Sequence, residues 1–303
     1  MVVKKKSLKF VAGKSTCLGC AIPIIVHTVL ENIDYPVVVS NATGCLEVTS
    51  TIYPHTSWNI PYIHSAFANS AATISGIESA FRVMKNRKKI KEKEVKFLVF
   101  AGDGGTYDIG LQALSGAFER GHDFLYVCYD NGAYMNTGGQ RSSATPLGAS
   151  TQTSPAGKKT FGKEQQRKDL MAIAVAHGIP YAATASIGHL DDFKNKVKKA
   201  IEIKGPKLLL VFSPCINVWK FPMGKTIEVA KLAVETNFWP LYEVENGLTK
   251  INYFPKEKLP ATDFLATQAR FKHLFALKNK EEIFREIQAE IDFKWSKLKI
   301  GLC

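Results

Sequence analysis

Short apolar runs alternate with longer segments of helical spacing along the first two thirds of this chain. The apolar runs are rich in β-branched or aromatic residues and lie at residues 36–40, 97–101, 124–129 and 207–212. The segments of helical spacing lie near residues 20–32, 67–85, 107–120, 166–177 and 190–203. Strands that are apolar on both faces are typical of parallel sheets covered by helices on each side. The pattern therefore predicts an α/β fold with a doubly wound, mostly parallel sheet.

Polar or glycine-rich segments follow each of the four predicted strands, at residues 41–45, 102–106, 130–134 and 213–215. Parallel strands end at the same edge of a sheet, and open α/β sheets bind ligands at that edge. We therefore expect Cys45, Asp103, Asn131 and Cys215 to lie close together, although the first and last are 170 positions apart.

The alternation weakens beyond residue 216, where Pro222, Pro240, Pro255 and Pro260 interrupt it. Residues 279–282 (Asn-Lys-Glu-Glu) resemble a capping box, and isoleucines at 283, 287 and 291 then fall on one face of a helix. We predict one α/β domain over residues 1–215. Residues 216–303 are predicted to form an extension packed on that domain or on a partner subunit.

Basic residues give the chain a formal net charge of +13, with clusters at residues 4–6 and 85–96. No aromatic residue interleaves the second cluster, as nucleic-acid-binding surfaces usually require. A solvated helix end and loop is therefore the favoured interpretation, without a nucleic-acid partner. No apolar run approaches the ~18–20 residues of a membrane span, and no secretory signal follows the basic N-terminus. We expect a cytoplasmic protein without a membrane partner.

A Gly-Asp-Gly sequence at residues 102–104 separates a predicted buried strand from a helix that begins near Tyr107. Glycines there allow the backbone to approach a phosphate, and the helix N-terminus offers free N–H groups. The Asp103 carboxylate would repel a phosphate unless a cation joined them, and Mg²⁺ does this through oxygen ligands. Asn131, 28 positions later, and the Ala133 carbonyl can supply further oxygens. By itself the tripeptide also fits an ordinary turn.

Six cysteines are the other candidate ligands: Cys17, Cys20, Cys45, Cys128, Cys215 and Cys303. In a cytosolic chain, clustered cysteines more often bind metal or carry out redox chemistry than form disulfides. The first two form a C-x-x-C pair. Four thiolates can hold an iron–sulfur cluster or zinc, and a single pair can act as a redox dithiol, so the spacing leaves these open. Cys128 is predicted to be a small core residue, and Cys303 incidental.

Resemblance to a known family favours the cluster. Residues 102–146 resemble the thiamine-diphosphate motif, in which Gly-Asp-Gly is followed by asparagine. The sequences CLGC (17–20), NATGC (41–45) and SPC (213–215) resemble those of β subunits of 2-oxoacid:ferredoxin oxidoreductases. The resemblance covers most of residues 8–247, including PHTSW at 54–58, AHGIP at 176–180 and residues 230–246.

The resemblance implies three cofactors: thiamine diphosphate, Mg²⁺ and a 4Fe–4S cluster. It implies that Mg²⁺ binds Asp103, Asn131 and the carbonyl of Ala133. Its implied ligands for the cluster are Cys17, Cys20, Cys45 and Cys215. The residues implied to contact thiamine diphosphate are Gly44, Gly102, Asp103, Gly104, Asn131 and Asn136. Asn136, in the sequence YMNTGGQ at 134–140, would be the catalytic residue facing the substrate, although a turn residue beside Gly138 is the alternative.

The implied activity is CoA-dependent oxidative decarboxylation of pyruvate to acetyl-CoA and CO₂, or the reverse synthesis, with electrons passing through the cluster to ferredoxin. The family's glutamate that activates thiamine lies in a pyrimidine-binding domain that we do not find in this sequence. The implied assembly therefore adds an α subunit carrying that domain, a γ subunit and a ferredoxin-like δ subunit. The sequences NATGCLEV and YMNTGGQ resemble enzymes for small 2-oxoacids, so 2-oxoisovalerate and oxalate stay open as alternatives.

Two other interpretations compete with this one. A non-redox thiamine diphosphate enzyme would keep Asp103 and Asn131 without needing four cysteines. A basic zinc or nucleic-acid-binding protein would use Cys17, Cys20 and the lysine clusters. The chain also departs from the family pattern after Cys20, where Ala-Ile replaces the common Gly-Glu, and at 67–69, where FAN replaces FEN. These departures bear on substrate identity more than on the fold.

Overall fold

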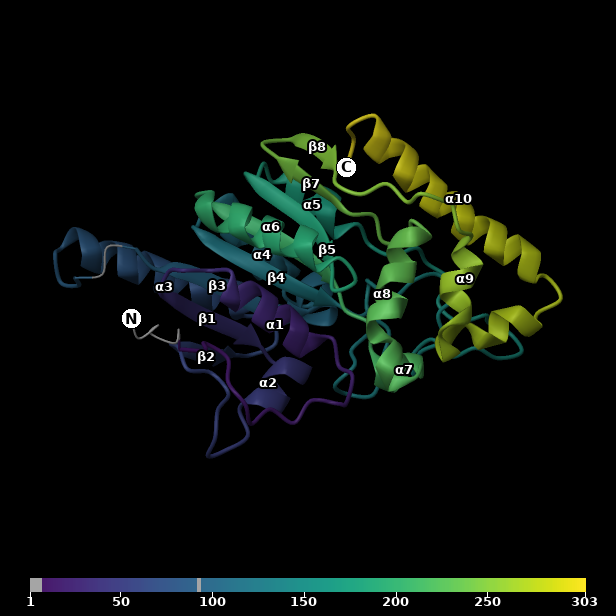
Figure 1. Cartoon of the computed structure of the whole chain (residues 1–303), viewed down its shortest axis with the longest axis horizontal. Helices are drawn as coiled ribbons and strands as arrows, with labels where there is room; N and C mark the ends of the chain where they lie inside the picture. Colours follow the sequence, from purple (N-terminus) through teal and green to yellow (C-terminus); the bar gives the residue numbers. More distant parts are fainter. Residues whose placement is uncertain (1–6, 92–93) are drawn as a thin grey trace, which may run out of the picture.

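One eight-stranded sheet organises the computed structural model, which describes residues 7–91 and 94–303 (Figure 1). The strand order is β2-β1-β3-β4-β6-β5-β7-β8; the first six strands in this order run parallel, and β7 and β8 are antiparallel additions. The strands are β1 (Val37–Ala42), β2 (Tyr62–Ser65), β3 (Lys96–Gly102), β4 (Phe124–Asp130), β5 (Tyr181–Ser186), β6 (Pro206–Phe212), β7 (Tyr242–Glu245) and β8 (Leu248–Ile251).

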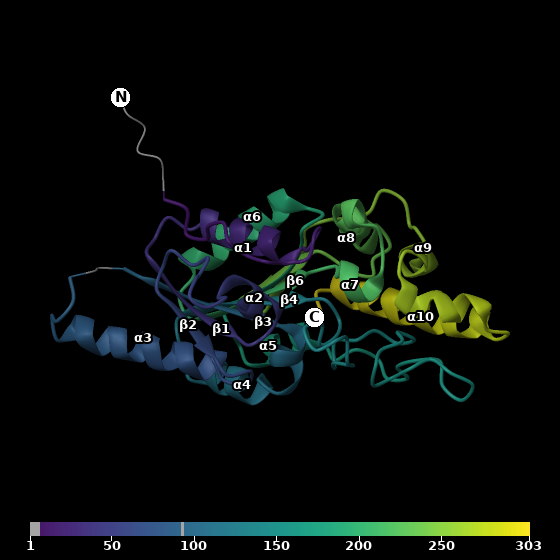
Figure 2. The same ribbon diagram turned by 90° about the horizontal axis from the view of Figure 1, so that it is seen from below.

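Helices cover both faces of the sheet, as predicted for a doubly wound fold. In Figure 2, α1 and α6 lie on one face, and α3, α4 and α5 lie on the other. The longer α-helices are α1 (Ile22–Glu31), α3 (Ser70–Asn86), α4 (Leu111–Glu119), α6 (Leu190–Glu202), α8 (Thr226–Glu235) and α10 (Lys280–Lys299). The short ones are α2 (Cys45–Ser50), α5 (Leu170–Ala176), α7 (Ile216–Trp219) and α9 (Ala261–Ala266), with turns η1 (Gly104–Asp108), η2 (Met223–Lys225) and η3 (Ala269–Ala276).

The four predicted strands are confirmed as β1, β3, β4 and β6, which are consecutive neighbours in the sheet. β5 escaped prediction because its sequence, Tyr-Ala-Ala-Thr-Ala-Ser, is dominated by alanine, which has low strand propensity. Its six residues are nevertheless all buried between β6 and β7. β2 escaped because it is a short strand at the edge of the sheet.

The segment after residue 215 contributes to the same sheet through β7 and β8, which the weak sequence pattern did not predict. Helices α8, α9 and α10 lie together beside the sheet (Figure 1). α10 buries Ile283, Ile287 and Ile291 on one face, as the spacing predicted. The predicted capping box is wrong, because Asn279 is the N-cap residue but makes no side-chain capping hydrogen bond. The division at residue 215 stays a prediction.

Aromatic rings join this segment to the strands that carry the site. Phe212, the last residue of β6, packs against Trp219, Trp239 and Phe264, with ring centroids 5.7, 4.8 and 5.9 Å away. Phe264 in α9 is fully buried and also contacts Phe238 at 4.6 Å. Such rings contribute area burial and about 0.5–1.5 kcal/mol per pair beyond it.

We therefore expect Phe264→Ala to lower the free energy of unfolding by about 3–5 kcal/mol, because the cavity lies where the C-terminal segment meets the sheet. Urea denaturation followed by circular dichroism measures this change. Phe293→Ala on α10 is the matched control, because Phe293 is 60% exposed and its loss should cost within about 0.5 kcal/mol. Equal effects of the two substitutions would contradict the packing described here.

Candidate functional site

The ends of β1, β3, β4 and β6 meet at one edge of the sheet, as the sequence predicted. Their registers place Gly102 beside Tyr129 and Asp130 beside Phe212. Two cavities open at this edge. The first, of about 690 Å³ with part open to solvent, is lined by residues 43–45, 67, 102–105, 129, 131 and 133–137. The second, of about 510 Å³ on the same measure, is lined by residues 16, 17, 20, 22, 45, 49, 131, 135 and 213–217.

Three polar groups converge at the floor of the first cavity. The Asn131 side-chain amide directs one atom to 2.9 Å from both Asp103 Oδ1 and the carbonyl oxygen of Ala133. As placed, that atom is the oxygen; with the amide turned over, its nitrogen would donate a hydrogen bond to each. Adjacent ligands of octahedral Mg²⁺, at 2.0–2.1 Å from the ion, lie about 3 Å apart. With its oxygen turned toward them, the Asn131 amide would stand at a distance from Asp103 Oδ1 and the Ala133 carbonyl that fits adjacent ligands of Mg²⁺.

The electrostatics of Asp103 also fit a cation. Asp103 is 1% exposed, and burial together with the charge of Asp130 raises its pKa well above the usual value. Ser142 Oγ donates a hydrogen bond to Asp103 Oδ2, and the backbone N–H of Asn131 approaches Oδ1 at 3.4 Å. No lysine or arginine forms an ion pair with Asp103 within residues 7–91 and 94–303. A buried carboxylate without a counter-ion is costly, and a bound divalent cation would relieve that cost.

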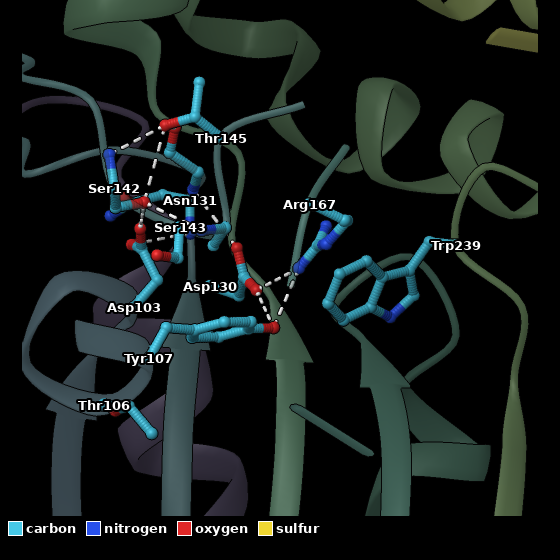
Figure 3. Close-up of polar contacts among 12 residues, drawn as sticks. Asp103, Thr106, Tyr107, Asp130, Asn131, Ser142, Ser143, Thr145, Arg167 and Trp239 are labelled. Atoms are coloured by element: carbon cyan, nitrogen blue, oxygen red, sulfur yellow. Dashed lines mark hydrogen bonds and ion pairs between the residues drawn. The ribbon is translucent and has the colours of Figure 1, made fainter. Parts of the chain in front are cut away.

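Asp130, on the neighbouring strand, has the counter-ion that Asp103 lacks (Figure 3). Arg167 Nη2 lies 2.5 Å from Asp130 Oδ2, and the Tyr107 hydroxyl donates to the same oxygen at 2.6 Å. Oδ1 accepts a hydrogen bond from the backbone N–H of Gly132 at 3.1 Å. The Arg167 guanidinium also lies 5.1 Å from the ring centre of Trp239. The network fixes the backbone that carries Asn131.

Glycine backbone forms one wall of the first cavity. A Cβ atom at Gly104 would lie 2.4 Å from Cε1 of the Tyr134 ring, so no larger residue fits there. The predicted helix from residue 107 begins earlier, with one π-helical turn (η1) that exposes the backbone at Gly104 and Gly105 to the cavity. Bare backbone at a helix start is suited to contact phosphate oxygens.

The four predicted cluster cysteines all line the second cavity. Cys17 is exposed, and the other three are partly buried. Burial, reinforced by the other cysteines, raises the pKa of Cys20 to about 12 and that of Cys45 to about 11. These thiols therefore need a bound cation to ionise at neutral pH. In the described ranges no three Cys, His, Asp or Glu side chains have the spacing to hold a single metal ion.

Residues 17–20 owe their conformation to the C-terminal segment. Gly19 has φ +79°, and a Cβ there would lie 2.4 Å from the Met223 carbonyl oxygen. The Thr226 hydroxyl donates to the Gly19 carbonyl at 2.6 Å. Glycine is therefore required between the two cysteines, and α8 anchors the turn.

The remaining predicted residues are also located. Asn136 is exposed and lines the first cavity, and its side chain partly offsets the rise in the pKa of Cys45 that burial causes. Gly44 and Gly102 border the same cavity beside Tyr129. Cys128 is fully buried in β4. Cys303 lines neither cavity; its sulfur lies 3.4 Å from the Tyr242 hydroxyl.

Sequence reasoning missed the residues that support the metal loop, notably Tyr107, Ser142 and Arg167. Tyr107 lies in the segment 102–146 that resembles the thiamine-diphosphate motif, but the sequence gives no sign that its hydroxyl reaches Asp130 on the next strand. Arg167 lies in the sequence Gln-Gln-Arg-Lys-Asp, which reads as an ordinary solvated helix start. Only the fold brings it against Asp130, 37 positions away.

Comparison with known proteins gives concordant results. Residues 42–211 match the family described as "Thiamine pyrophosphate enzyme, C-terminal TPP binding domain". Pyruvate synthase subunit PorB of Thermotoga maritima is 50% identical over 298 residues, covering 97% of this chain and 92% of the relative. The Methanocaldococcus jannaschii subunit of the same name is 50% identical over 286 residues, covering 94% of each. Ketoisovalerate oxidoreductase subunit VorB of Pyrococcus abyssi is 44% identical over 293 residues, covering 96% of this chain and 92% of the relative.

Among solved structures, a 2-oxoglutarate:ferredoxin oxidoreductase from Magnetococcus marinus aligns with a TM-score of 0.59 at 19% identity. The alignment covers 76% of this chain and 82% of that one. At this identity the likeness shows the shared fold. Within the described ranges, no helix combines the length and the apolarity needed to cross a membrane.

Removal of the Arg167 charge should strongly destabilise the protein, because it leaves Asp130 buried without its counter-ion. We expect Arg167→Met to lower the free energy of unfolding by about 3 kcal/mol or more. Lys194→Met is the control, since it breaks an exposed ion pair with Asp191 and should cost less than about 1 kcal/mol. Chemical denaturation of both variants measures the difference, and similar costs would show that Asp130 does not depend on Arg167.

Proposed function

Because this chain belongs to the thiamine pyrophosphate enzymes, as the β subunit of a 2-oxoacid:ferredoxin oxidoreductase, we propose that its 2-oxoacid is pyruvate. The reaction is then the CoA-dependent oxidative decarboxylation of pyruvate to acetyl-CoA and CO₂, or its reverse. The pyruvate synthase subunits reported above share 50% identity with this chain, against 44% for the ketoisovalerate subunit. 2-Oxoisovalerate is therefore the second candidate substrate.

Thiamine diphosphate is the cofactor of the matched domain, and the first cavity is its proposed site. We assign Mg²⁺ to Asp103, Asn131 and the Ala133 carbonyl, because the Asn131 amide stands at a fitting distance from the other two. Gly44, Gly102 and Gly104 present backbone to the cofactor. Held by these residues, thiamine diphosphate would supply carbanion chemistry toward the keto carbon of the substrate.

The second cavity is the proposed site of a 4Fe–4S cluster on Cys17, Cys20, Cys45 and Cys215. A cluster held by these four cysteines would supply one-electron transfer. Four cysteine thiolates are the usual ligand set of such clusters. The raised pKa values of Cys20 and Cys45 indicate that these thiols stay protonated without a bound cation, so cluster binding would be coupled to proton release.

One observation carries the proposal: the two cavities share a wall. Cys45, Asn131 and Met135 line both of them. A cofactor in the first cavity and a cluster in the second would therefore be separated by the thickness of one side chain. A non-redox thiamine enzyme gains nothing from this arrangement, whereas single-electron transfer depends on such proximity.

Asn136 is the proposed catalytic residue of this chain. It lines the first cavity next to Met135, which belongs to the shared wall, and it interacts with the Cys45 side chain. From that position its amide can hydrogen-bond a substrate oxygen and orient it. The Asp130 network acts behind it, keeping the backbone of Asn131 and Gly132 in place.

The relatives are named as subunits, and we propose that this chain acts within an assembly of the same kind. The first cavity is open to solvent, which leaves room for an α subunit to complete it and to supply the activating glutamate. A γ subunit and a ferredoxin-like δ subunit complete the proposed complex, and ferredoxin receives the electrons.

Substrate identity is tested by purifying the chain with its partners without oxygen and measuring CoA-dependent viologen reduction. Pyruvate, 2-oxoisovalerate, 2-oxoglutarate and oxalate are the substrates to compare. We expect pyruvate to give a kcat/KM at least about tenfold above the others, equivalent to about 1.4 kcal/mol of transition-state binding. The chain alone should show no turnover. A preference for 2-oxoisovalerate, or robust turnover without partners, would contradict the proposal.

The cluster site is tested by replacing one proposed ligand and one unrelated cysteine. We expect Cys215→Ser to reduce the iron and acid-labile sulfide bound to this chain, because it removes a thiolate from the second cavity. Cys303→Ser, which removes a partly buried cysteine outside that cavity, should leave both contents unchanged. Iron and sulfide analysis of anaerobically purified chain measures the result. Loss of iron in both variants, or in neither, would count against the assigned ligands.

A further inference from the structure

Arg270 is a buried cation that the proposed mechanism does not use. It lies in η3 and is 5% exposed. Its Nε donates a hydrogen bond to Gln268 Oε1 at 2.8 Å, whereas Nη1 has no hydrogen-bond partner. No carboxylate forms an ion pair with it within the described residues. A buried charge without a compensating partner is costly, so its presence calls for a source of negative charge nearby.

The guanidinium lies between the two cofactor loops. Its carbon is 4.0 Å from the ring centre of Trp219, at the end of the short helix that follows Cys215. Trp219 Nε1 in turn donates to the Asn131 carbonyl at 3.1 Å. On the other side, Arg270 Nη1 would lie 2.9 Å from a Cβ atom placed on Gly132.

Electrostatic interactions link Arg270 to residues of both loops. Its positive charge lowers the pKa of Cys215, although burial raises that pKa overall. Burial lowers the pKa of Arg270 to about 9, against the charges of Asp130, Cys215 and Asp103, which favour its charged form. Asp130, however, is already bound by Arg167 and Tyr107. The thiolates proposed to ligate the cluster, Cys215 among them, would therefore add to Asp103 as negative charge that is free to balance Arg270.

We propose that Arg270 sets the reduction potential of the cluster held by Cys215, by placing a fixed positive charge beside it. The inference rests on the proposed function. One-electron reduction adds a negative charge to the cluster, and a buried cation close by stabilises that charge more than it would in water. Charge and hydrogen bonding near the sulfurs are established determinants of cluster potential. Arg270 thereby makes the cluster a better acceptor for electrons from the first cavity.

The test is a redox titration of the anaerobically purified complex, followed by electron paramagnetic resonance. We expect Arg270→Gln to reduce the equilibrium constant for reduction of this cluster about tenfold, which is about 59 mV for one electron. Lys272→Gln removes a positive charge from the exposed side of the same turn and should leave the potential unchanged. Signals from clusters of partner subunits serve as internal references.

A second variant covers the case in which Arg270→Gln does not assemble. Gln268→Glu is almost isosteric, keeps the Arg270 stack on Trp219 and places a carboxylate against Nε. It should also lower the potential. A wild-type complex in which this chain gives no cluster signal, beside those of the partner subunits, would refute the proposed cluster site and this inference together. An intact cluster with one unchanged potential in wild type, Arg270→Gln and Gln268→Glu would refute this inference alone.

Discussion

Four neighbouring parallel strands that end at one edge of the sheet are the constraint on which the site depends. Parallel pairing brings the residues after β1, β3, β4 and β6 to that edge, whatever their separation in sequence. The same edge must then hold buried carboxylates and thiols, which are costly to bury without partners. Arg167 offsets the cost for Asp130 by pairing with its carboxylate. Asp103 and the thiols are left for bound cations to neutralise.

The two carboxylates beside Asn131 show how the cost is divided. Asp130 is neutralised permanently by Arg167 and Tyr107, and so can serve as a fixed support for the Gly132 backbone. Asp103 has only neutral donors and a raised pKa. One carboxylate is therefore committed to the fold, while the other is left for a ligand. Asp130 therefore has a structural role, and Asp103, at the end of the adjacent strand, is available to bind a ligand.

The sequence predicted the central strands and the convergence of their ends, because continuous apolar runs and glycine-rich turns are local signals. It could not predict β5, whose alanines carry no strand signal, or β7 and β8, whose pairing depends on a strand 60 positions away. The proposed ligands Asp103, Asn131 and the four cysteines came from motif and resemblance. Arg167 and Arg270 could not, because their partners Asp130 and Trp219 are set only by tertiary packing.

The shared wall of Cys45, Asn131 and Met135 has an implication for how such a protein can diverge. A substitution at any of these three positions changes the lining of both cavities at once. The binding properties of one cavity therefore cannot be altered there without altering those of the other. Divergence in substrate choice is then directed to the open, outward rim of the first cavity, where a neighbouring chain can vary. The residues of the shared wall are therefore expected to stay constant, whereas the outward rim of the first cavity is free to change.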